Sequence, residues 1–354
     1  MLSVIILSGS GLAGALLCHW LRIPAGVLIG TILGVSGGSA ILGFPPLMVP
    51  KEATQTLQIM IGLLVGSQIS RSSLASGARS LIPAFLITAI MILTGVISAL
   101  VVVRLTTVDP VTAFFAAAPG GIAQMSIIGA SLGADGAAVA AVHLARLLLA
   151  NACVVLAFAY FNRGGGGRPA PVSPVQSEAH PTKEVELEGA KATKRFVAMM
   201  LVGVAGGIAG LATPVPAGGV IGALFSSAAV RLLKPAPIPF RGGHLAVQAL
   251  GGGVIGLGVT SDFLDKFAGF ATAGSIIVFA HVLVWLATFY PLAKLFRFDI
   301  MTSAFASAPG GMVEAISSAA RTEASTIIVA FVHLIRLSAT IAVAPSLIVF
   351  ILTN

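Results

Sequence analysis

The sequence predicts an all-α polytopic membrane protein built from two homologous helical halves, each containing a helix broken at a Pro-Gly-Gly sequence. Three observations support this: apolar segments recur along the whole 354-residue chain, only 9% of the residues are charged, and the second half repeats the first. Soluble domains carry about 25% charged residues, and a soluble fold of this size cannot bury so large an apolar fraction. The chain as a whole is therefore not expected to be a soluble enzyme, a DNA-binding domain, a secreted disulfide scaffold or a disordered protein.

The apolar segments have lengths that span or nearly span a bilayer, and they give about 10–12 predicted membrane segments. The first one lacks a basic region and a cleavage site, so we interpret it as a membrane segment rather than a signal peptide. In the first half the segments cover residues 2–18, 24–42, 54–69, 81–103, 111–132 and 136–161, and in the second half 196–212, 216–233, 245–260, 268–293, 301–320 and 324–352.

A polar stretch separates the two halves. Residues 162–195 contain a glycine run, several prolines and charges of both signs, a composition that favours an exposed flexible linker. The predicted domains are therefore a first membrane repeat at 1–161, the linker at 162–195 and a second membrane repeat at 196–354. The net charge of +8 comes from Lys and Arg between apolar segments. By the positive-inside rule, we expect the linker to lie in the cytoplasm. We expect the protein itself to lie in the inner membrane.

The two halves are copies of one module, because residues 104–147 align with residues 294–337 without a gap. Such duplication is typical of secondary transporters. The aligned pairs include Asp109 with Asp299, Pro119 with Pro309, His143 with His333, Arg146 with Arg336, and, further upstream, Gln58, Gly62 and Gly66 with Gln248, Gly252 and Gly256. The glycines recur four residues apart, a spacing that lets helix backbones approach closely in lipid.

The relative orientation of the halves depends on whether residues 111–132 cross the bilayer. If this segment dips in and returns, each half has five crossings and the halves are inverted, with both chain ends on the side opposite the linker. If it crosses fully, each half has six spans, the halves are parallel and both ends are cytoplasmic. The distribution of Lys and Arg slightly favours inversion.

The strongest local motif is Ala-Pro-Gly-Gly in the middle of an apolar segment, once in each half. Pro119 and Pro309 remove a backbone donor and disfavour helix just before them, and the following glycines tolerate unusual dihedral angles. We expect each helix to break and to restart at Gly120 or Gly310. The free N–H groups of the restarted helix favour an anion or another polar ligand. The alternative is a plain kink between packed helices.

Each broken segment is followed by a His-x-x-Arg motif, formed by His143 and Arg146 and repeated by His333 and Arg336. Residues three apart share a helix face, and an arginine at membrane depth needs a partner inside the bundle. These arginines are expected either to hydrogen-bond carbonyls that the break frees or to supply positive charge to a substrate cavity.

The two copies differ five residues after the proline, where Gln124 stands in the first half and Glu314 in the second. Glu314 is the one carboxylate within the predicted membrane depth, which makes it a candidate proton or cation carrier; the alternative is a permanent ion pair with Arg336 or Arg146. Asp109 and Asp299 are expected to cap the helices that start the broken segments, and Asp135 to be a loop or cap residue.

Other residues suggest no chemistry. The remaining histidines make no zinc or copper spacing, and the sequence contains no nucleotide-binding or nucleophile-elbow motif. We therefore expect no metal, no cofactor and no enzyme activity. Cys18 and Cys153 are interpreted as small core residues. The remaining histidines, which form no metal-binding spacing, are His19, His180, His244 and His281.

The paired Ala-Pro-Gly-Gly motifs, each followed by Val-His-Leu-x-Arg-Leu (residues 142–147 and 332–337), resemble the bacterial membrane AbrB family over nearly the whole chain apart from the linker. The resemblance implies a duplicated membrane domain, and members carry the labels regulator of gene expression and ammonia monooxygenase. No metal-ligand cluster supports the second label, and nothing resembles the soluble DNA-binding regulator of the same name. Architecturally, the halves also resemble cation/proton antiporter and anion transporter folds, which is an analogy only.

These observations predict a secondary transporter or permease for a small polar or anionic solute, coupled to protons or cations, with a cavity where the two breaks meet and with alternating access by rocking between the halves. The alternative is a membrane-embedded solute sensor that regulates gene expression. Expected partners are the lipid bilayer, the solute, protons or cations and a second copy of the chain, but not nucleic acid. The predicted solute-binding or ion-binding residues are Pro119, Gly120, Gly121, Gln124, His143, Arg146, Pro309, Gly310, Gly311, Glu314, His333 and Arg336.

Overall fold

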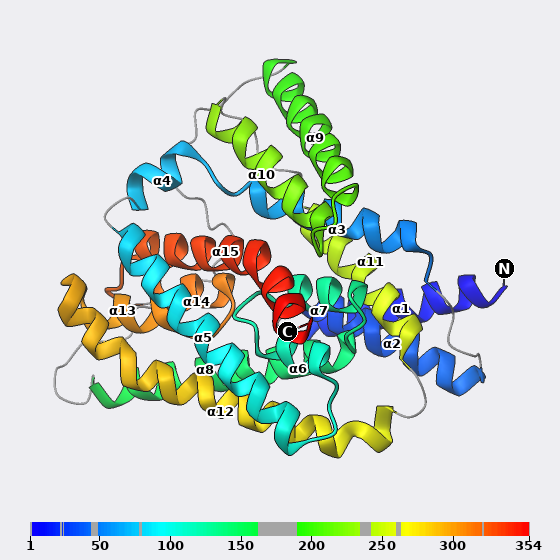
Figure 1. Ribbon diagram of the computed structural model, residues 1–354, viewed down its shortest axis with the longest axis horizontal. Coiled ribbons are helices and arrows are strands. Elements are labelled where there is room, and N and C mark those ends of the chain that lie inside the picture. Colours follow the sequence, from blue (N-terminus) through cyan, green and yellow to red (C-terminus); the bar gives the residue numbers. More distant parts are fainter. Residues whose placement is uncertain are drawn as a thin grey trace.

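The computed structural model is helical throughout the residues that it describes, which are 2–21, 23, 25–43, 49–77, 80–161, 190–233, 242–259, 263–320 and 322–353 (Figure 1). In the first half the helices are α1 (Leu2–Trp20), α2 (Gly26–Leu42), α3 (Lys51–Gly66), α4 (Arg71–Gly77), α5 (Leu81–Leu105), α6 (Pro110–Ala117), α7 (Ile122–Ser131) and α8 (Gly136–Phe161). In the second half they are α9 (Ala190–Leu211), α10 (Gly218–Leu233), α11 (Gly242–Gly258), α12 (Phe263–Phe296), α13 (Ile300–Ser307), α14 (Met312–Ala319) and α15 (Thr326–Thr353).

Several helices have the length and composition needed to cross a membrane. Among the described residues four qualify by both criteria: Leu81–Leu105, Thr193–Leu211, Gly269–Phe296 and Thr326–Thr353. Shorter apolar helices accompany them, including Gly26–Leu42 and Gly218–Leu233. The outer face of α5 exposes large apolar side chains, with Ile82 74% and Leu93 60% exposed, as expected for a face that contacts lipid rather than water.

The two halves are inverted relative to each other. The helices α5 and α12 occupy equivalent places in the repeat, and they run in opposite directions (Figure 1). The equivalent pair α8 and α15 is also antiparallel in the same view. Two homologous helical halves, each with a broken helix, were predicted from the sequence, and the structure confirms this fold class.

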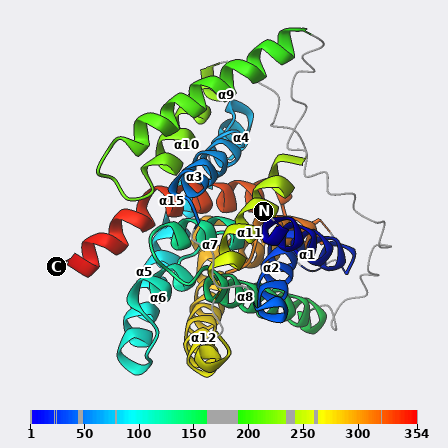
Figure 2. The same cartoon turned by 90° about the vertical axis from the view of Figure 1, so that its right-hand side faces the viewer.

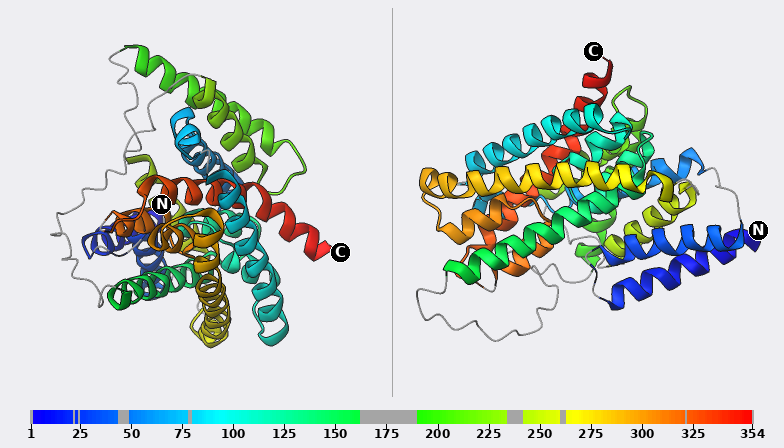
Figure 3. Two further views of the ribbon diagram at one scale, coloured as in Figure 1. Left: turned by 90° about the vertical axis from the view of Figure 1, so that its left-hand side faces the viewer. Right: turned by 90° about the horizontal axis from the view of Figure 1, so that it is seen from below.

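The helices form two bodies, and each body takes helices from both halves. The first, which we call the scaffold, contains α1, α2, α3, α9, α10 and α11, in which α3 packs on α10 and α11 packs on α2. The second, which we call the core body, contains α5 to α8 and α12 to α15. Figures 2 and 3 show the scaffold helices gathered along one side of the core body.

Glycines allow the scaffold helices to touch. A Cβ on Gly62 of α3 would overlap the Val220 carbonyl of α10, and a Cβ on the equivalent Gly252 of α11 would lie 2.6 Å from the Leu28 carbonyl of α2. A Cβ on Gly30 of α2 would overlap the Gly14 carbonyl of α1. The predicted close-packing role of the glycine spacing is therefore confirmed, and the repeated glycines join one half to the other as well as neighbouring helices within a half.

Two boundaries differ from the sequence prediction. Helix α9 begins at Ala190, so residues 190–195 of the predicted linker are helical, while residues 162–189 lie outside the described part of the chain. The short helix α4 was not predicted, because its seven residues form no apolar segment of recognisable length.

Candidate functional site

Both predicted breaks are present. Helix α6 ends at Ala117 and α7 begins at Ile122, and in the second half α13 ends at Ser307 and α14 begins at Met312. Ala118 and Ala308, the residues before the prolines, have ψ angles of 138° and 136°, which are not helical, as expected for a residue before proline.

The predicted role of the glycines in the breaks is wrong. Gly121 and Gly311 have φ angles of −79° and −75°, which any L-residue adopts, and they act as N-caps, so each helix restarts two residues later than expected. The glycines of the first break are needed because they leave room for neighbouring side chains. A Cβ on Gly121 would overlap Gln124 Oε1, and a Cβ on Gly120 would lie 2.5 Å from Met125 Cγ. Side chains of the first turn of α7 therefore fold back over the break.

Each broken segment enters and returns to the same end of the molecule. The backbone N–H of Asp135 donates to Thr112 Oγ1 at 2.7 Å, and that of Ser325 donates to Thr302 Oγ1, also at 2.7 Å. A segment that crossed a bilayer would separate its ends by about 30 Å. The parallel arrangement of the halves is therefore wrong, because residues 111–132 do not cross.

The predicted caps are confirmed. Asp109 Oδ1 accepts the Thr112 N–H at 2.8 Å, and Asp299 Oδ1 accepts the Thr302 N–H at 2.7 Å. Asp135 Oδ1 accepts two N–H groups at the start of α8, each at 3.0 Å. These carboxylates hold the outer ends of the broken segments.

In the first half, the His-x-x-Arg motif on α8 braces the break. Both terminal nitrogens of Arg146 donate to the Ala118 carbonyl, at 3.1 and 3.2 Å, and His143 Nε2 donates to the Phe115 carbonyl at 3.0 Å. Because a carbonyl only accepts, the neutral His143 ring carries its hydrogen on Nε2, and its Nδ1 accepts from Arg146 at 3.1 Å. Both side chains are buried.

The second half repeats this bracing with one difference. Arg336 donates to two carbonyls, Ala308 O and Gly310 O, each at 2.8 Å, whereas Arg146 donates to one. His333 Nε2 donates to the Phe305 carbonyl at 3.0 Å, and its Nδ1 accepts from Arg336, also at 3.0 Å. The structural role expected for these arginines is therefore present in both halves.

The two braced breaks lie close together in the core body. Arg146 and Arg336 are near enough to interact electrostatically, and Thr340 of α15 donates to the Pro119 carbonyl at 3.4 Å, which ties the second half to the first break. Among the described side chains, the hydrogen-bond partners of the two guanidinium groups are backbone carbonyls and the neighbouring histidines. Two positive charges are thus concentrated at the junction of the breaks.

His281 of α12 belongs to this cluster, although no sequence motif indicates a role for it. Its side chain is fully buried, and its Nδ1 lies 2.9 Å from the Ile277 carbonyl of its own helix. It lies within electrostatic range of both Arg146 and Arg336. One signal could have identified it: His281 is a polar residue in the middle of a predicted membrane segment, and the first half has Met91 at the equivalent position.

Of the two predicted site residues that follow the prolines by five positions, the structure describes the side chain of only one, Gln124. Gln124 is half-buried beside Gly121 at the start of α7. The side chain of Glu314 lies outside the described part of the chain, so its proposed carrier role and its alternative ion pair stay predictions. Among the described residues, no group of histidine, cysteine and acidic side chains could hold a metal ion.

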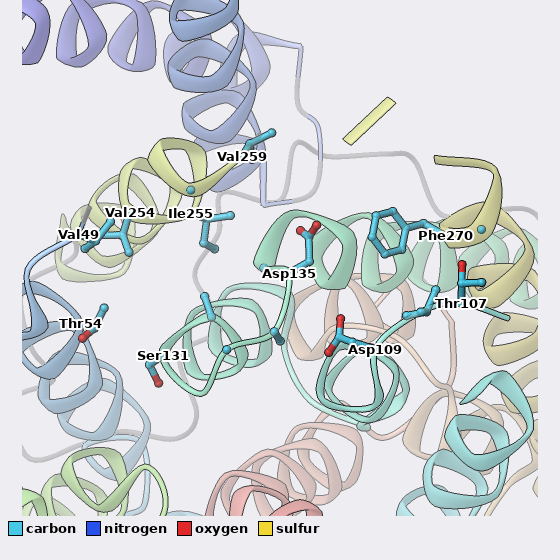
Figure 4. Close-up of a pocket in the computed structure, with 17 residues that line it drawn as sticks. Val49, Thr54, Thr107, Asp109, Ser131, Asp135, Val254, Ile255, Val259 and Phe270 are labelled. Carbon is cyan, nitrogen blue, oxygen red and sulfur yellow. The ribbon is translucent and has the colours of Figure 1, made fainter. Parts of the chain in front are cut away.

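A cavity of about 750 Å³ lies between the scaffold and the core body at the outer end of the first broken segment, residues 110–131 (Figure 4). Asp109, Ser131 and Asp135 line it from the core body, and Thr54 and Ile255 line it from the scaffold. The two bodies are linked beside it, because Gln58 Nε2 of α3 donates to Ser131 Oγ at 3.0 Å. The cavity therefore reaches the broken segment along the boundary of the two bodies.

Comparison with known proteins agrees with the duplication. The family described as transition state regulatory protein AbrB matches the chain twice, over residues 1–162 and 152–352. The chain belongs to the AbrB family. The uncharacterized protein YhjN of Bacillus subtilis (strain 168) is 32% identical over 151 residues, which are 41% of this chain and 39% of that protein. The similarity to YhjN thus spans about two fifths of its length. No solved structure matches the chain.

Proposed function

We propose that this AbrB-family protein is a secondary transporter for a small polar or anionic solute. The observation that carries the proposal is the meeting of two broken, re-entrant helices from inverted halves, with Arg146 and Arg336 buried at their junction. Broken backbone at membrane depth is tolerated where it is buried in protein or lines a polar cavity, and transporters place their solutes at such breaks between repeats. The concentration of positive charge favours an anion.

Alternating access would come from movement of the core body against the scaffold. The sequence suggested rocking between the two halves, but α3 packs on α10 and α11 packs on α2, so the halves interlock in the scaffold. If the core body moves against the scaffold instead, the glycine contacts within the scaffold stay intact, because each body contains helices of both halves. The cavity that Asp109, Asp135 and Ile255 line would then be an access path to the first break.

Coupling would involve Glu314 as a proton or cation carrier, because a carboxylate at membrane depth is costly and usually functional. The protein would lie in the inner membrane with residues 162–189 in the cytoplasm, following the distribution of Lys and Arg. It would act without a cofactor and without enzyme activity, and a second copy of the chain would be a possible partner.

The test is solute flux in proteoliposomes that contain the purified protein. We expect saturable uptake of a small anion that responds to a proton or cation gradient. Glu314→Gln should abolish the gradient dependence, and Arg336→Ala should abolish the flux in protein that still folds. His19→Met serves as a matched control, because His19 is exposed at the end of α1. Full flux in both site variants would contradict the site assignment.

A second candidate function is a membrane-embedded solute sensor, which the description of the matching family as a regulatory protein favours. A sensor would bind the solute at the same breaks but would not move it across the bilayer. Solute-induced thermal stabilisation without flux would favour this candidate over transport.

A further inference from the structure

We propose that Gln58 is a positioning residue that holds the core body in one of two positions against the scaffold, and that Gln248 holds it in the other. The hydrogen bond from Gln58 to Ser131 then favours the state in which the cavity of Figure 4 is present. This inference rests on the proposed function and deepens it, because it names the contacts that control alternating access.

The cavity between the two bodies opens on the face of the protein opposite the linker. Helix α8 starts at Gly136, which lines the cavity, and ends at Phe161, where the linker follows in the sequence. A helix of 26 residues is about 39 Å long, so the cavity and the linker are at opposite ends of α8. Gly133 and Gly258, which also line the cavity, are exposed. The structure therefore shows the state whose access path opens away from the linker.

Helix α7, the returning arm of the first broken segment, contacts the scaffold through one face. Ile127 and Ser131 are four residues apart and share that face. A Cβ on Gly251 of α11 would overlap the Ile127 side chain, so Ile127 fits a notch that the glycine leaves. Ser131 Oγ accepts from Gln58 Nε2 of α3 at 3.0 Å. Both contacts cross the boundary between the bodies, so movement of the core body along the scaffold breaks them.

Gln58 depends on its contact with Ser131, because the glutamine amide is buried in the scaffold. The side chain is 7% exposed, and its Oε1 has no hydrogen-bond partner among the described residues. Ser131 depends on the contact less, because its hydroxyl donates to the Ile128 carbonyl at 2.7 Å within α7. When the core body moves away, the Gln58 amide loses its described partner. A buried amide without partners is costly, so the bond stabilises the state that the structure shows.

The second half carries a glutamine at the equivalent place. Gln248 of α11 aligns with Gln58 of α3 and is also 7% exposed. In this state α7 packs on α3 and α11 of the scaffold, whereas α14, its counterpart, packs mainly on α13 and α15 of the core body. Because the halves are inverted, a movement that separates α7 from the scaffold brings α14 toward it. Gln248 then meets the second broken segment as Gln58 meets the first.

The notch beside Gln58 is also exchanged between the halves. The pair equivalent to Ile127 and Gly251 is Ser317 and Ile61. The large residue of the pair is on the core body in the first case and on the scaffold, in α3, in the second. Either pairing sets one large residue against a small one, so the sequence suits a contact of α14 with α3 as well as that of α7 with α11.

The experiment measures the rates at which a small charged methanethiosulfonate modifies two single cysteines in purified protein that lacks Cys18 and Cys153. Ile255→Cys lies in the wall of the cavity. Val65→Cys is its counterpart in the repeat, at a position that is fully buried in this state. Each cysteine reacts when its own side of the protein is open, so the ratio of the two rates follows the populations of the two states.

The two glutamines should have opposite effects on this ratio. Gln58→Met keeps the length of the side chain but removes the amide, and it should shift the ratio toward Val65→Cys by about three- to tenfold. Gln248→Met should shift the ratio toward Ile255→Cys. A general loosening of the fold would instead raise both rates in both variants.

Two further variants sharpen the test. Gln55→Met is the matched control, because Gln55 is exposed on the same helix, and it should leave the ratio unchanged. Ser131→Ala removes the same hydrogen bond as Gln58→Met, so the double variant should shift the ratio no further than the stronger single variant.

An unchanged ratio in Gln58→Met would overturn the inference, as would shifts in the same direction in Gln58→Met and Gln248→Met, or additive effects of Gln58→Met and Ser131→Ala. If solute flux is present in such protein, transport stands and only the role of the glutamines is rejected. Absence of flux together with an unreactive Val65→Cys in every variant would reject the proposed function as well.

Discussion

Asp135 donates its backbone N–H to the hydroxyl of Thr112 at 2.7 Å, and this bond joins the two ends of the first broken segment. Ser325 and Thr302 form the same bond in the second half. Because each segment returns to the end at which it entered, it adds no crossing to its half, as in the inverted arrangement of the halves.

The first prediction concerns the sidedness of the chain. We expect both chain ends to lie on one face of the membrane and the linker on the other. The measurement is labelling by an impermeant maleimide of Ser3→Cys, Ser173→Cys and Thr353→Cys, each in a background without Cys18 and Cys153. Ser3→Cys and Thr353→Cys should react from the same side and Ser173→Cys from the opposite side. Labelling of all three from one side would restore the parallel arrangement.

The second prediction compares the two arginines. Arg336→Ala removes the donor to two carbonyls, the buried Ala308 O and the half-buried Gly310 O. Arg146→Ala removes the donor to Ala118 O, which still accepts the Gly120 N–H at 2.9 Å. Each buried carbonyl left unpaired costs about 1–3 kcal/mol. Both variants should therefore unfold at lower temperature in detergent, and Arg336→Ala should be the less stable of the two.

The thermal midpoint of each variant, followed by circular dichroism, decides this comparison. Arg104→Ala is a suitable control, because Arg104 is exposed near the end of α5 and its loss should leave the midpoint nearly unchanged. A reversed order of the two site variants would mean that the bracing hydrogen bonds do not govern stability.

The third prediction uses two adjacent glycines of α11. A Cβ on Gly252 would lie 2.6 Å from the Leu28 carbonyl, while a Cβ on Gly253 would meet nothing within 4 Å. Gly252→Ala should force α11 away from α2 and cost about 1–3 kcal/mol. Gly253→Ala should be neutral or stabilising by up to about 1 kcal/mol, because alanine favours helix over glycine. Equal thermal midpoints for the two variants would argue against the close packing of α2 and α11.

Much of this fold could be predicted from the sequence because the controlling features are local. Proline and its neighbours dictate the breaks at Pro119 and Pro309, and the gapless repeat dictates two similar halves. The spacing of Gly62 and Gly66 predicted close helix contacts, but it could not name α10 as the partner, since that contact joins residues far apart in the chain. The orientation of the halves likewise depended on contacts between residues far apart in the chain, such as that between Thr112 and Asp135.

The candidate site was predicted less completely. The sequence offered two roles for Arg146 and Arg336 and could not say which carbonyls they would bond. His281 gave no motif, because its neighbours in space, Arg146 and Arg336, come from other helices. The sequence singled out the glycines of the first break, but for the wrong reason. Their backbone angles do not require glycine, whereas the folded-back side chains of Gln124 and Met125 need the space that glycine leaves.

Transport requires the core body to move against the scaffold, and a reversible cross-link between the two bodies tests this movement most directly. A Cβ on Gly136 at the start of α8 would lie 2.9 Å from Ile255 Cγ1 of α11, so the pair Gly136→Cys and Ile255→Cys can form a disulfide that joins the two bodies. In a background without Cys18 and Cys153, we expect oxidation to stop solute flux in proteoliposomes and reduction to restore it, while either single cysteine variant is unaffected by oxidation. Full flux through protein in which this disulfide has formed would contradict the account.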